Sequence, residues 1–496
     1  MTDAPRRRPD HVVVVGGGIT GLTAAYRLSQ GGVHVTVVEP DRIGGKLQTS
    51  LVAGRPVDET ADAFLLRVPW ALALCHDLEL DGELISPAER TAHLFLDGHR
   101  RPMPGGHVMG VPTDLDALAA SGIVSAAGVE RARADLTLPA DPADPGASGA
   151  DVAIGPYLRR RLGDEVVDRL IDPLLGGINA GDTATMSLAA VVPQLDAAAR
   201  SGDPSLIRSC TAQRDRALAA SGGSGAVVGT VDQPAGAPPV FATPIGGMAR
   251  LVDALLALMP AVDIRQGRRV EAIERRTAPG VDRVQVALDD GSTLDADAVV
   301  VACPAHAAGP LLAEAAPDAS SAFTAIDHSS IAMLTMAFDR AALGDTAGAS
   351  GCLVPRSEGT LLTAVSYATS KWAQLRDPGR DDVILRTSVG RTGDVRFQDL
   401  DDDALTERVL ADLDHVVGVH GAPTEVRIGR WMRSFPQYAP GHLDRIDAVE
   451  ASLGDGPIRL AGMALRGVGI PACIRSAEDA VASLGVTWPT RRGLGG

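Results

Sequence analysis

The chain has 496 residues, more than a single hydrophobic core usually stabilises, so two or three domains are expected. Hydrophobic residues make up 45% of the chain and charged residues 22%, which is typical of a globular protein. The net charge of −16 excludes a protein that grips the phosphate backbone of nucleic acid, because such a protein would be basic. An anionic small substrate would need a local cluster of arginines to overcome this overall field.

The five cysteines form no CxxC pair, and their number is odd. We therefore expect neither a disulfide framework nor a metal site, and a reducing compartment. The apolar run at residues 12–15 is too short for the core of a signal peptide. No stretch approaches the roughly 20 apolar residues of a membrane span, so we expect no such span and a cytoplasmic location.

The first elements in chain order form one strand–helix–strand unit. The apolar run at 11–15 predicts a buried strand, and helical apolar spacing predicts a helix over 21–30. A second apolar run at 33–38 predicts another strand, which ends at Glu39.

A helical, alanine-rich pattern extends from about residue 110 to 210. Within it, residues 157–171 predict one amphipathic helix that Pro173 ends. The arginines at 159–161 are interpreted as part of a solvated face. Residues 139–149 are rich in Pro, Asp, Ala and Gly and predict a loop.

The second half of the chain is mostly strand-like. Residues 221–239 predict a surface connection, residues 405–417 a helix, and a last helix is expected from about Ala477 after a glycine turn. Strands are predicted at 262–264, 269–273, 283–288, 298–302, 331–338, 361–367, 383–389 and 458–461.

The first motif with chemical meaning is the glycine run from Gly16 to Gly21, between the first strand and the first helix. Its glycines allow a tight turn, a close approach of the backbone to a pyrophosphate, and packing of helix on strand. Glu39 at the end of the second strand is placed to accept hydrogen bonds from ribose hydroxyls. The acidic residue favours FAD or NAD over NADP.

Two further glycine segments extend this pattern. Residues 42–49 hold the pair Gly44–Gly45 directly after the second strand, where another backbone segment can close on a bound dinucleotide. NAD dehydrogenases lack this extension, whereas FAD-containing amine oxidases and their relatives carry it, so this resemblance favours FAD. Residues 460–474 form a second strand–glycine loop–helix, whose N–H groups and dipole suit a reduced, anionic flavin.

Together these segments resemble the flavin-dependent protoporphyrinogen/coproporphyrinogen oxidase family over almost the whole chain. The most specific matches are 173–182, Pro436–Tyr438 with Gly441–His442, and 467–471. The first two are not general flavoprotein motifs, so they separate this family from amine oxidases and phytoene desaturases. The matching segments, in order, are 16–21, 44–46, 58–65, 171–182, 244–251, 431–442 and 461–474.

The resemblance implies a set of FAD contacts but no named catalytic residue. The implied substrate contacts are Asn179 to the macrocycle, and Arg67 and His93 to propionates. The FAD contacts are Gly16, Gly17, Gly18, Ile19, Thr20, Gly21, Glu39, Pro40, Gly45, Lys46, Thr60, Ala61, Asp62, Ala63, Val270, Trp431, Gly462, Val468, Gly469 and Ile470. The chain departs from the family pattern at Thr60, Asn179, Phe435, Leu465 and Ala472.

The implied fold is mixed α/β. It comprises an FAD-binding Rossmann-like domain of the amine-oxidase type, a β-sheet substrate domain and a helical domain. The expected boundaries are 1–60, 236–303 and 428–496 for the FAD-binding domain, 61–97, 211–235 and 304–427 for the substrate domain, and 98–210 for the helical domain.

The implied activity is the oxidation of a porphyrinogen by non-covalently bound FAD, with dioxygen as the acceptor and a ferrochelatase as the next enzyme. The arginine-biased composition resembles the soluble bacterial branch, which oxidises coproporphyrinogen III to coproporphyrin III; protoporphyrinogen IX is the alternative substrate.

An amine oxidase of the same fold is a rival function, and such enzymes commonly use a lysine near the flavin. Here Lys46 belongs to the segment of the glycine pair, and the sequence around Lys371 predicts an exposed position. Aromatic residues, at 3%, are sparse for an amine cage. A flavin-binding scaffold without turnover is the third possibility.

Overall fold

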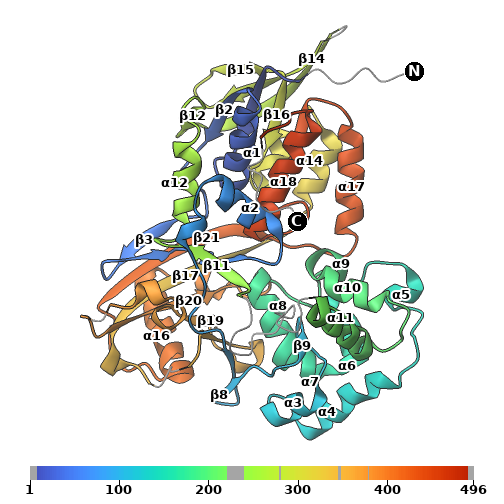
Figure 1. Ribbon diagram of the computed structural model, residues 1–496, viewed down its shortest axis with the longest axis vertical. Helices are drawn as coiled ribbons and strands as arrows, with labels where there is room; N and C mark the ends of the chain where they lie inside the picture. Colours follow the sequence, from blue (N-terminus) through green and yellow to red (C-terminus); the bar gives the residue numbers. More distant parts are fainter. Residues whose placement is uncertain (1–7, 221–238, 279–280, 345–347, 378, 490–496) are drawn as a thin grey trace.

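The upper part of the molecule in Figure 1 is built on a five-stranded parallel sheet in the order β12-β2-β1-β16-β22. The computed structural model describes residues 8–220, 239–278, 281–344, 348–377 and 379–489. The sheet joins strands from opposite ends of the chain: β1 (His11–Val15), β2 (His34–Glu39), β12 (Asp263–Gln266), β16 (Ala298–Val301) and β22 (Ile458–Leu460).

Both faces of this sheet are covered, which explains why β1 is an unbroken run of valines. Val12 and Val14 belong to one core, whereas Val13 and Val15 belong to the core on the other face. The first core is shared with α1 (Ile19–Gln30), α2 (Pro69–Asp77), α12 (Ala249–Ala257) and α18 (Ile470–Ser483). The second is shared with β13 (Val270–Ala278), β14 (Val281–Leu288), β15 (Thr293–Ala296), α13 (Ala305–Leu311), α14 (Pro317–Thr324) and α17 (His442–Leu453).

A seven-stranded sheet, in the order β21-β17-β20-β19-β18-β7-β8, occupies the lower left of Figure 1. Its neighbouring strands are antiparallel except for β18 and β7, which run parallel. Helix α16 (Asp402–Val417) packs its apolar face, with Leu405, Val409 and Leu413, into the core of this sheet. The strands are β7 (Ala92–Leu96), β8 (His99–Pro102), β17 (His328–Asp339), β18 (Gly351–Leu353), β19 (Leu362–Tyr367), β20 (Asp382–Val389) and β21 (Glu425–Pro436).

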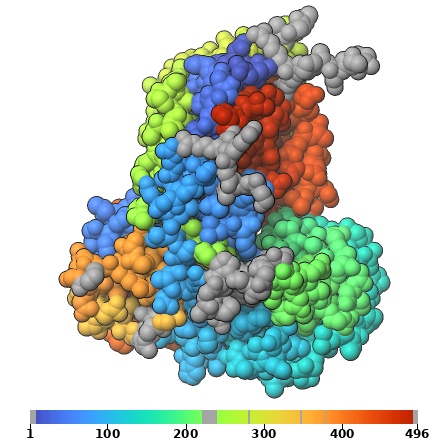
Figure 2. Space-filling model, in the orientation of Figure 1, coloured from blue at the N-terminus to red at the C-terminus, as the bar shows by residue number. Residues whose placement is uncertain are grey.

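Short strands connect the two sheets. They are β3 (Thr49–Val52), β4 (Arg55–Asp58) and β5 (Phe64–Leu65), and β5 pairs with β11 (Phe241–Pro244) from the middle of the chain. Figure 2 shows the light-blue part of the chain that comes after the β3–β4 hairpin running down the front of the molecule from the upper to the lower part.

The helical part lies at the lower right of Figure 1 around a core of its own. The structure thereby confirms the helical pattern expected from about residue 110 to 210. Its helices are α3 (Leu115–Ser121), α4 (Ala126–Arg133), α5 (Pro145–Ser148), α6 (Ile154–Leu162), α7 (Asp164–Val166), a π-helical turn (Val167–Ile171), α8 (Asp172–Asn179), α9 (Leu188–Val191), α10 (Pro193–Ala199) and α11 (Leu206–Ala220).

The prediction of a single helix over residues 157–171 is wrong. Gly163 interrupts it with φ of +91°, a conformation that favours glycine. The chain then continues helically through the π-helical turn into α8, and Pro173 lies in the first turn of α8 rather than ending a helix. The π-helical turn directly precedes this proline, whose nitrogen carries no hydrogen to donate to the turn before it.

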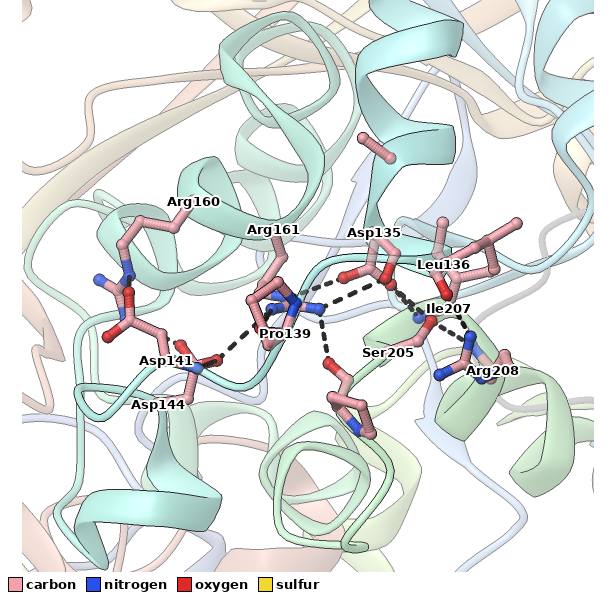
Figure 3. Close-up of polar contacts among 12 residues, drawn as sticks. Asp135, Leu136, Pro139, Asp141, Asp144, Arg160, Arg161, Ser205, Ile207 and Arg208 are labelled. Atoms are coloured by element: carbon pink, nitrogen blue, oxygen red, sulfur yellow. Dashed lines mark hydrogen bonds and ion pairs between the residues drawn. The ribbon is translucent and has the colours of Figure 1, made fainter.

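The arginine run at 159–161 is not simply a solvated face, because Arg161 is only 2% exposed (Figure 3). Its Nε donates to Asp135 Oδ1 at 2.7 Å and its Nη1 to the Pro139 carbonyl at 3.0 Å. The other carboxylate oxygen of Asp135 accepts from the Ser205 hydroxyl and from the Ile207 N–H. This buried network joins α6, the 139–149 segment and the start of α11.

The mixed α/β class is confirmed by these layers. The boundaries of the three expected domains stay a prediction. The connection predicted at 221–239 lies, up to residue 238, outside the described residues. Among the residues that are described, no helix is both long and apolar enough to cross a membrane.

Candidate active site

The first glycine motif forms the turn between β1 and α1. Gly16 adopts φ of +108°, and a Cβ at Gly21 would lie 1.8 Å from the Gly16 carbonyl oxygen, so glycine alone lets α1 pack this closely. A Cβ at Gly18 would meet nothing within 4 Å, which leaves open space before the N-terminus of α1. The free N–H groups and the helix dipole suit a pyrophosphate at this point. The other predicted contacts in this turn are Gly17, Ile19 and Thr20.

Glu39 ends β2 beside the same turn. Its Oε2 accepts from the Gly17 N–H at 2.7 Å, and its Oε1 accepts from the Asp41 N–H at 2.9 Å. A carboxylate offers about four acceptor sites, so these two bonds leave capacity for ribose hydroxyls. The contact of Glu39 and the neighbouring Pro40 with a ribose stays a prediction.

The second glycine segment closes on the first. The Gly44 N–H donates to the Gly17 carbonyl at 2.8 Å, and a Cβ at Gly45 would lie 3.3 Å from the Gly18 Cα. The structure thus brings together the two glycine segments that are predicted to bind one dinucleotide.

Lys46 follows this pair and has no acidic partner among the described residues. The contact found for its Nζ is the Met463 sulfur, at 3.7 Å. Burial lowers the pKa of Lys46, which means that its ammonium group is poorly solvated. An anionic group placed beside Lys46 would relieve this cost, as a flavin ring that gains negative charge would do.

The C-terminal glycine loop leads into α18 earlier than expected. The helix predicted from about Ala477 begins already at Ile470, so the prediction of its start is wrong. Its N-terminus therefore opens directly on the loop that holds Val468 and Gly469, with the positive end of its dipole at the site. A Cβ at Gly462 would lie 3.5 Å from the Thr20 hydroxyl, so the starts of α1 and α18 converge.

The segment Thr60–Ala63 is tied to the seven-stranded sheet by charge. The Asp62 carboxylate accepts from Lys371 Nζ at 2.9 Å, pairs with Arg386 at 3.0 Å and accepts from the Trp372 indole at 3.1 Å. Burial alone would raise the pKa of Asp62, but Lys371 and Arg386 hold it well below its usual range. Lys371 is thus partly buried and forms an ion pair, so the prediction that it lies in an exposed position is wrong.

Thr60, where the family pattern has glycine, is also fixed in place. Its hydroxyl donates to the Lys46 carbonyl at 2.5 Å, and its own carbonyl accepts from Arg386. The substitution is therefore accommodated by a bond to the second glycine segment. Arg386 could not be predicted as a site residue from sequence, because a lone arginine inside an apolar strand forms no motif.

Trp431 and Val270 complete the predicted cofactor contacts. The Trp431 indole N–H is buried without a hydrogen-bond partner, and the Arg42 guanidinium lies 5.3 Å from its ring centroid. Val270 is buried at the start of β13, next to the parallel sheet.

Two histidines that carry no sequence motif also lie within electrostatic range of Lys46. The rings of His306 and His328 meet edge to face at 4.9 Å. Burial lowers the pKa of His306 to about 4, and His328, Arg433 and Lys46 add to this effect. Both imidazoles are therefore neutral at physiological pH, so the positive charge beside them is carried by Lys46 and Arg433.

The three predicted substrate contacts lie in different parts of the fold. Asn179 ends α8, where its carbonyl accepts from the Gln437 side chain at 3.1 Å. His93 lies on β7, and its Nδ1 is buried without a partner. Arg67 is exposed just after β5. Their contacts with a substrate stay predictions.

These residues fit a flavin dinucleotide. The open space at Gly18 suits a phosphate, and Lys46, which has no acidic partner among the described residues, suits an anionic ring. The indole N–H of Trp431 is free to donate a hydrogen bond to a ligand. Among the described residues, no group of three or more His, Cys, Asp or Glu side chains is placed to hold a metal ion.

Comparison with known proteins defines the class. Residues 19–484 match the family described as flavin containing amine oxidoreductase. The chain is 32% identical over 480 residues to the coproporphyrinogen III oxidase of Bacillus subtilis (strain 168), covering 95% of this chain and 97% of that protein. It is 34% identical over 483 residues to the coproporphyrinogen III oxidase of Mycobacterium tuberculosis (strain ATCC 25618 / H37Rv), covering 96% and 97%.

The crystal structure of a proposed protoporphyrinogen oxidase from Exiguobacterium sp. 255-15 superposes with a TM-score of 0.80 at 30% identity, covering 96% of this chain and 98% of that one. The chain belongs to the flavin-containing amine oxidoreductases and, within them, to the group of the bacterial coproporphyrinogen III oxidases. The expected resemblance, the amine-oxidase type of FAD-binding fold and the flavin cofactor are confirmed.

We predict that the flavin is held without a covalent bond. Cys473 is the cysteine nearest the expected ring, but it is only 4% exposed, and burial raises the pKa of its thiol. A protonated thiol is a poor nucleophile. After acid precipitation the yellow colour should therefore stay in the supernatant; colour that remains in the protein pellet would contradict the prediction.

Proposed function

We propose that this chain oxidises coproporphyrinogen III to coproporphyrin III in haem biosynthesis. The observation that carries the proposal is the match, over almost the full length of both chains, to bacterial proteins named coproporphyrinogen III oxidase. The glycine turns, which leave room for a dinucleotide where the flavin family requires it, support the same conclusion.

We assign the cofactor contacts to the glycine turns and to the segments that converge on them. A bound FAD would supply the two-electron acceptor for the methylene bridges of the substrate. The residues of this chain orient the two partners and stabilise charge: Lys46 and the N-terminus of α18 favour negative charge on the ring. The assigned residues are Gly16–Gly21, Glu39, Pro40, Gly45, Lys46, Thr60–Ala63, Val270, Trp431, Gly462 and Val468–Ile470.

We assign no protein base to the reaction. Loss of the pyrrole protons is driven by formation of the aromatic macrocycle, and water can accept them. His306 and His328, which lie within electrostatic range of Lys46 and Arg433, are neutral, and this cationic surrounding suits an anionic substrate better than an amine cation.

Dioxygen as the final electron acceptor belongs to the same proposal. So does a ferrochelatase as the next enzyme, because the product is a metal-free porphyrin. We also place the reaction in the cytoplasm. The free state of the five cysteines, four of them buried, is compatible with that reducing compartment.

A side-by-side turnover assay with coproporphyrinogen III and protoporphyrinogen IX tests the choice of substrate. Coproporphyrinogen III carries four propionates where protoporphyrinogen IX carries two, with vinyl groups at the other positions. We expect faster turnover, in kcat/KM, of coproporphyrinogen III. Preference for protoporphyrinogen IX, or equal turnover, would overturn the assignment.

Arg67 provides a residue-level prediction. Its exposed position after β5 and its lack of an ion pair among the described residues suit a partly solvated carboxylate. A charge-assisted hydrogen bond is worth roughly 1.5–3 kcal/mol, so Arg67→Ala should raise KM for coproporphyrinogen III about tenfold or more. The value of kcat should change little, because a remote anchor binds ground state and transition state alike. An unchanged KM would remove Arg67 from the site.

A further inference from the structure

Arg391 is a buried cation that forms no ion pair with any described residue. It follows β20 and is only 8% exposed, and its Nε forms no hydrogen bond. Within the part of the chain that the structure describes, its guanidinium takes part in no ion pair. Arginine is seldom buried unless it is paired, since the charge must be solvated by other groups.

The two carboxylates near Arg391 are already engaged by other arginines. Asp172 pairs with Arg356 at 3.3 Å, and Asp394 pairs with Arg396 at 2.7 Å. Arg356 also pairs with Asp182 at 3.8 Å, so three guanidinium groups lie among three carboxylates; among the described residues, Arg391 is the one of the three arginines that forms no ion pair. The pKa of Arg391 falls to about 10 because of burial and, next, because of the charge on Arg356. An added carboxylate would relieve both effects.

The position of Arg391 connects it to the candidate substrate contact Asn179. The next residue, Thr392, donates its N–H to the carbonyl of Ala180 at 2.9 Å, directly after Asn179. On the other side, a Cβ at Gly390 would lie 2.6 Å from the Ser330 carbonyl. Arg391 is thus held between β17 and the end of α8.

Further polar atoms close to this place also lack partners. Gln437 bridges Asn179 and Ser329 through its amide nitrogen, at 3.1 Å each, but its Oε1 is buried without a hydrogen bond. The Ser434 hydroxyl on β21, the strand that ends just before Gln437, is buried and unpartnered too. Buried polar groups without partners mark a place where a ligand completes the hydrogen bonding.

We propose that Arg391 forms a carboxylate subsite, which takes one propionate of the porphyrinogen at the junction of β20 and α8. The inference rests on the proposed function, since that function supplies the carboxylate-bearing macrocycle. A guanidinium recognises a carboxylate through paired N–H donors, which a lysine cannot reproduce.

The test is a binding titration of the FAD-loaded enzyme with two porphyrins, coproporphyrin III and its tetramethyl ester, which lacks the carboxylates. Wild type should bind the acid more tightly than the ester. Arg391→Gln should weaken binding of the acid about tenfold or more and leave binding of the ester unchanged. Arg340→Gln, at an exposed position in the turn that follows β17, is the matched control and should leave both affinities unchanged.

Arg391→Lys keeps the charge and covers the case in which the glutamine variant does not fold. It should lower the preference for the acid over the ester without changing the melting temperature by more than the control does. An acid-over-ester ratio equal to that of wild type in both folded variants overturns the subsite while the proposed function stands. Wild type that binds neither porphyrin and does not turn over coproporphyrinogen III overturns the proposed function and the subsite with it.

Discussion

Replacing Gly21 by alanine is expected to disrupt both the fold of the glycine turn and FAD binding, whereas replacing Gly18 should affect FAD alone. The added Cβ at position 21 would lie 1.8 Å from the Gly16 carbonyl oxygen, so α1 must move away from the turn. Overpacking of this kind costs about 1–3 kcal/mol or more. The Cβ at position 18 meets no protein atom within 4 Å, and Gly18 has a φ of −75° that alanine adopts freely.

The measurements are the melting temperature of each apoprotein and its Kd for FAD. Gly18→Ala should melt like wild type yet bind FAD at least about tenfold more weakly, because the methyl group takes the space assigned to a phosphate. Gly21→Ala should melt at a lower temperature and bind FAD weakly as well. Wild-type affinity for FAD in Gly18→Ala would show that no phosphate lies against this turn.

The second large effect is expected at Arg161. Arg161→Met should destabilise the helical part by about 3–5 kcal/mol, because the Asp135 carboxylate is left buried without its cation. Asp135 is fully buried and also holds the start of α11 through Ser205 and Ile207, so the loss extends over several elements.

The neighbouring Arg160 provides the control for this experiment. Its side chain is 38% exposed, and exposed ion pairs contribute only about 0–1 kcal/mol. Thermal unfolding followed by circular dichroism, with protease cleavage in the helical part as a local readout, should separate Arg161→Met from Arg160→Met. Equal stability of the two variants would contradict the structural role assigned to the network in Figure 3.

The cofactor turns were predictable from sequence because their constraints are local. Gly16 forms the turn, Gly18 leaves room for a phosphate beside the backbone, and Gly21 lets the helix pack against the turn. All three lie in one short segment, and the structure places each as expected. The Gly44–Gly45 pair was predictable for the same reason. The ordinary strands, with their apolar runs, were also found within a few residues of their predicted positions.

The charged parts of the site were not predictable, because they depend on pairing across the chain. Lys371 and Asp62 form an ion pair although they are 309 positions apart in the sequence, and no motif around either residue predicts this pair. The burial of Arg161 depends on Asp135, which lies in an unremarkable helical segment. The importance of Arg391 becomes visible only when Asp172 and Asp394 are seen to be taken by Arg356 and Arg396.

The central claim is that this chain passes electrons from a porphyrinogen to its flavin. Its most direct test is to add coproporphyrinogen III to the FAD-loaded enzyme without oxygen and to follow the absorbance of oxidised flavin. The account predicts that the flavin bleaches by accepting two electrons per FAD, that air restores the colour, and that coproporphyrin III, the product of a six-electron oxidation, accumulates once air is admitted. Flavin that stays oxidised with coproporphyrinogen III, but bleaches when an amine is added instead, would contradict the account.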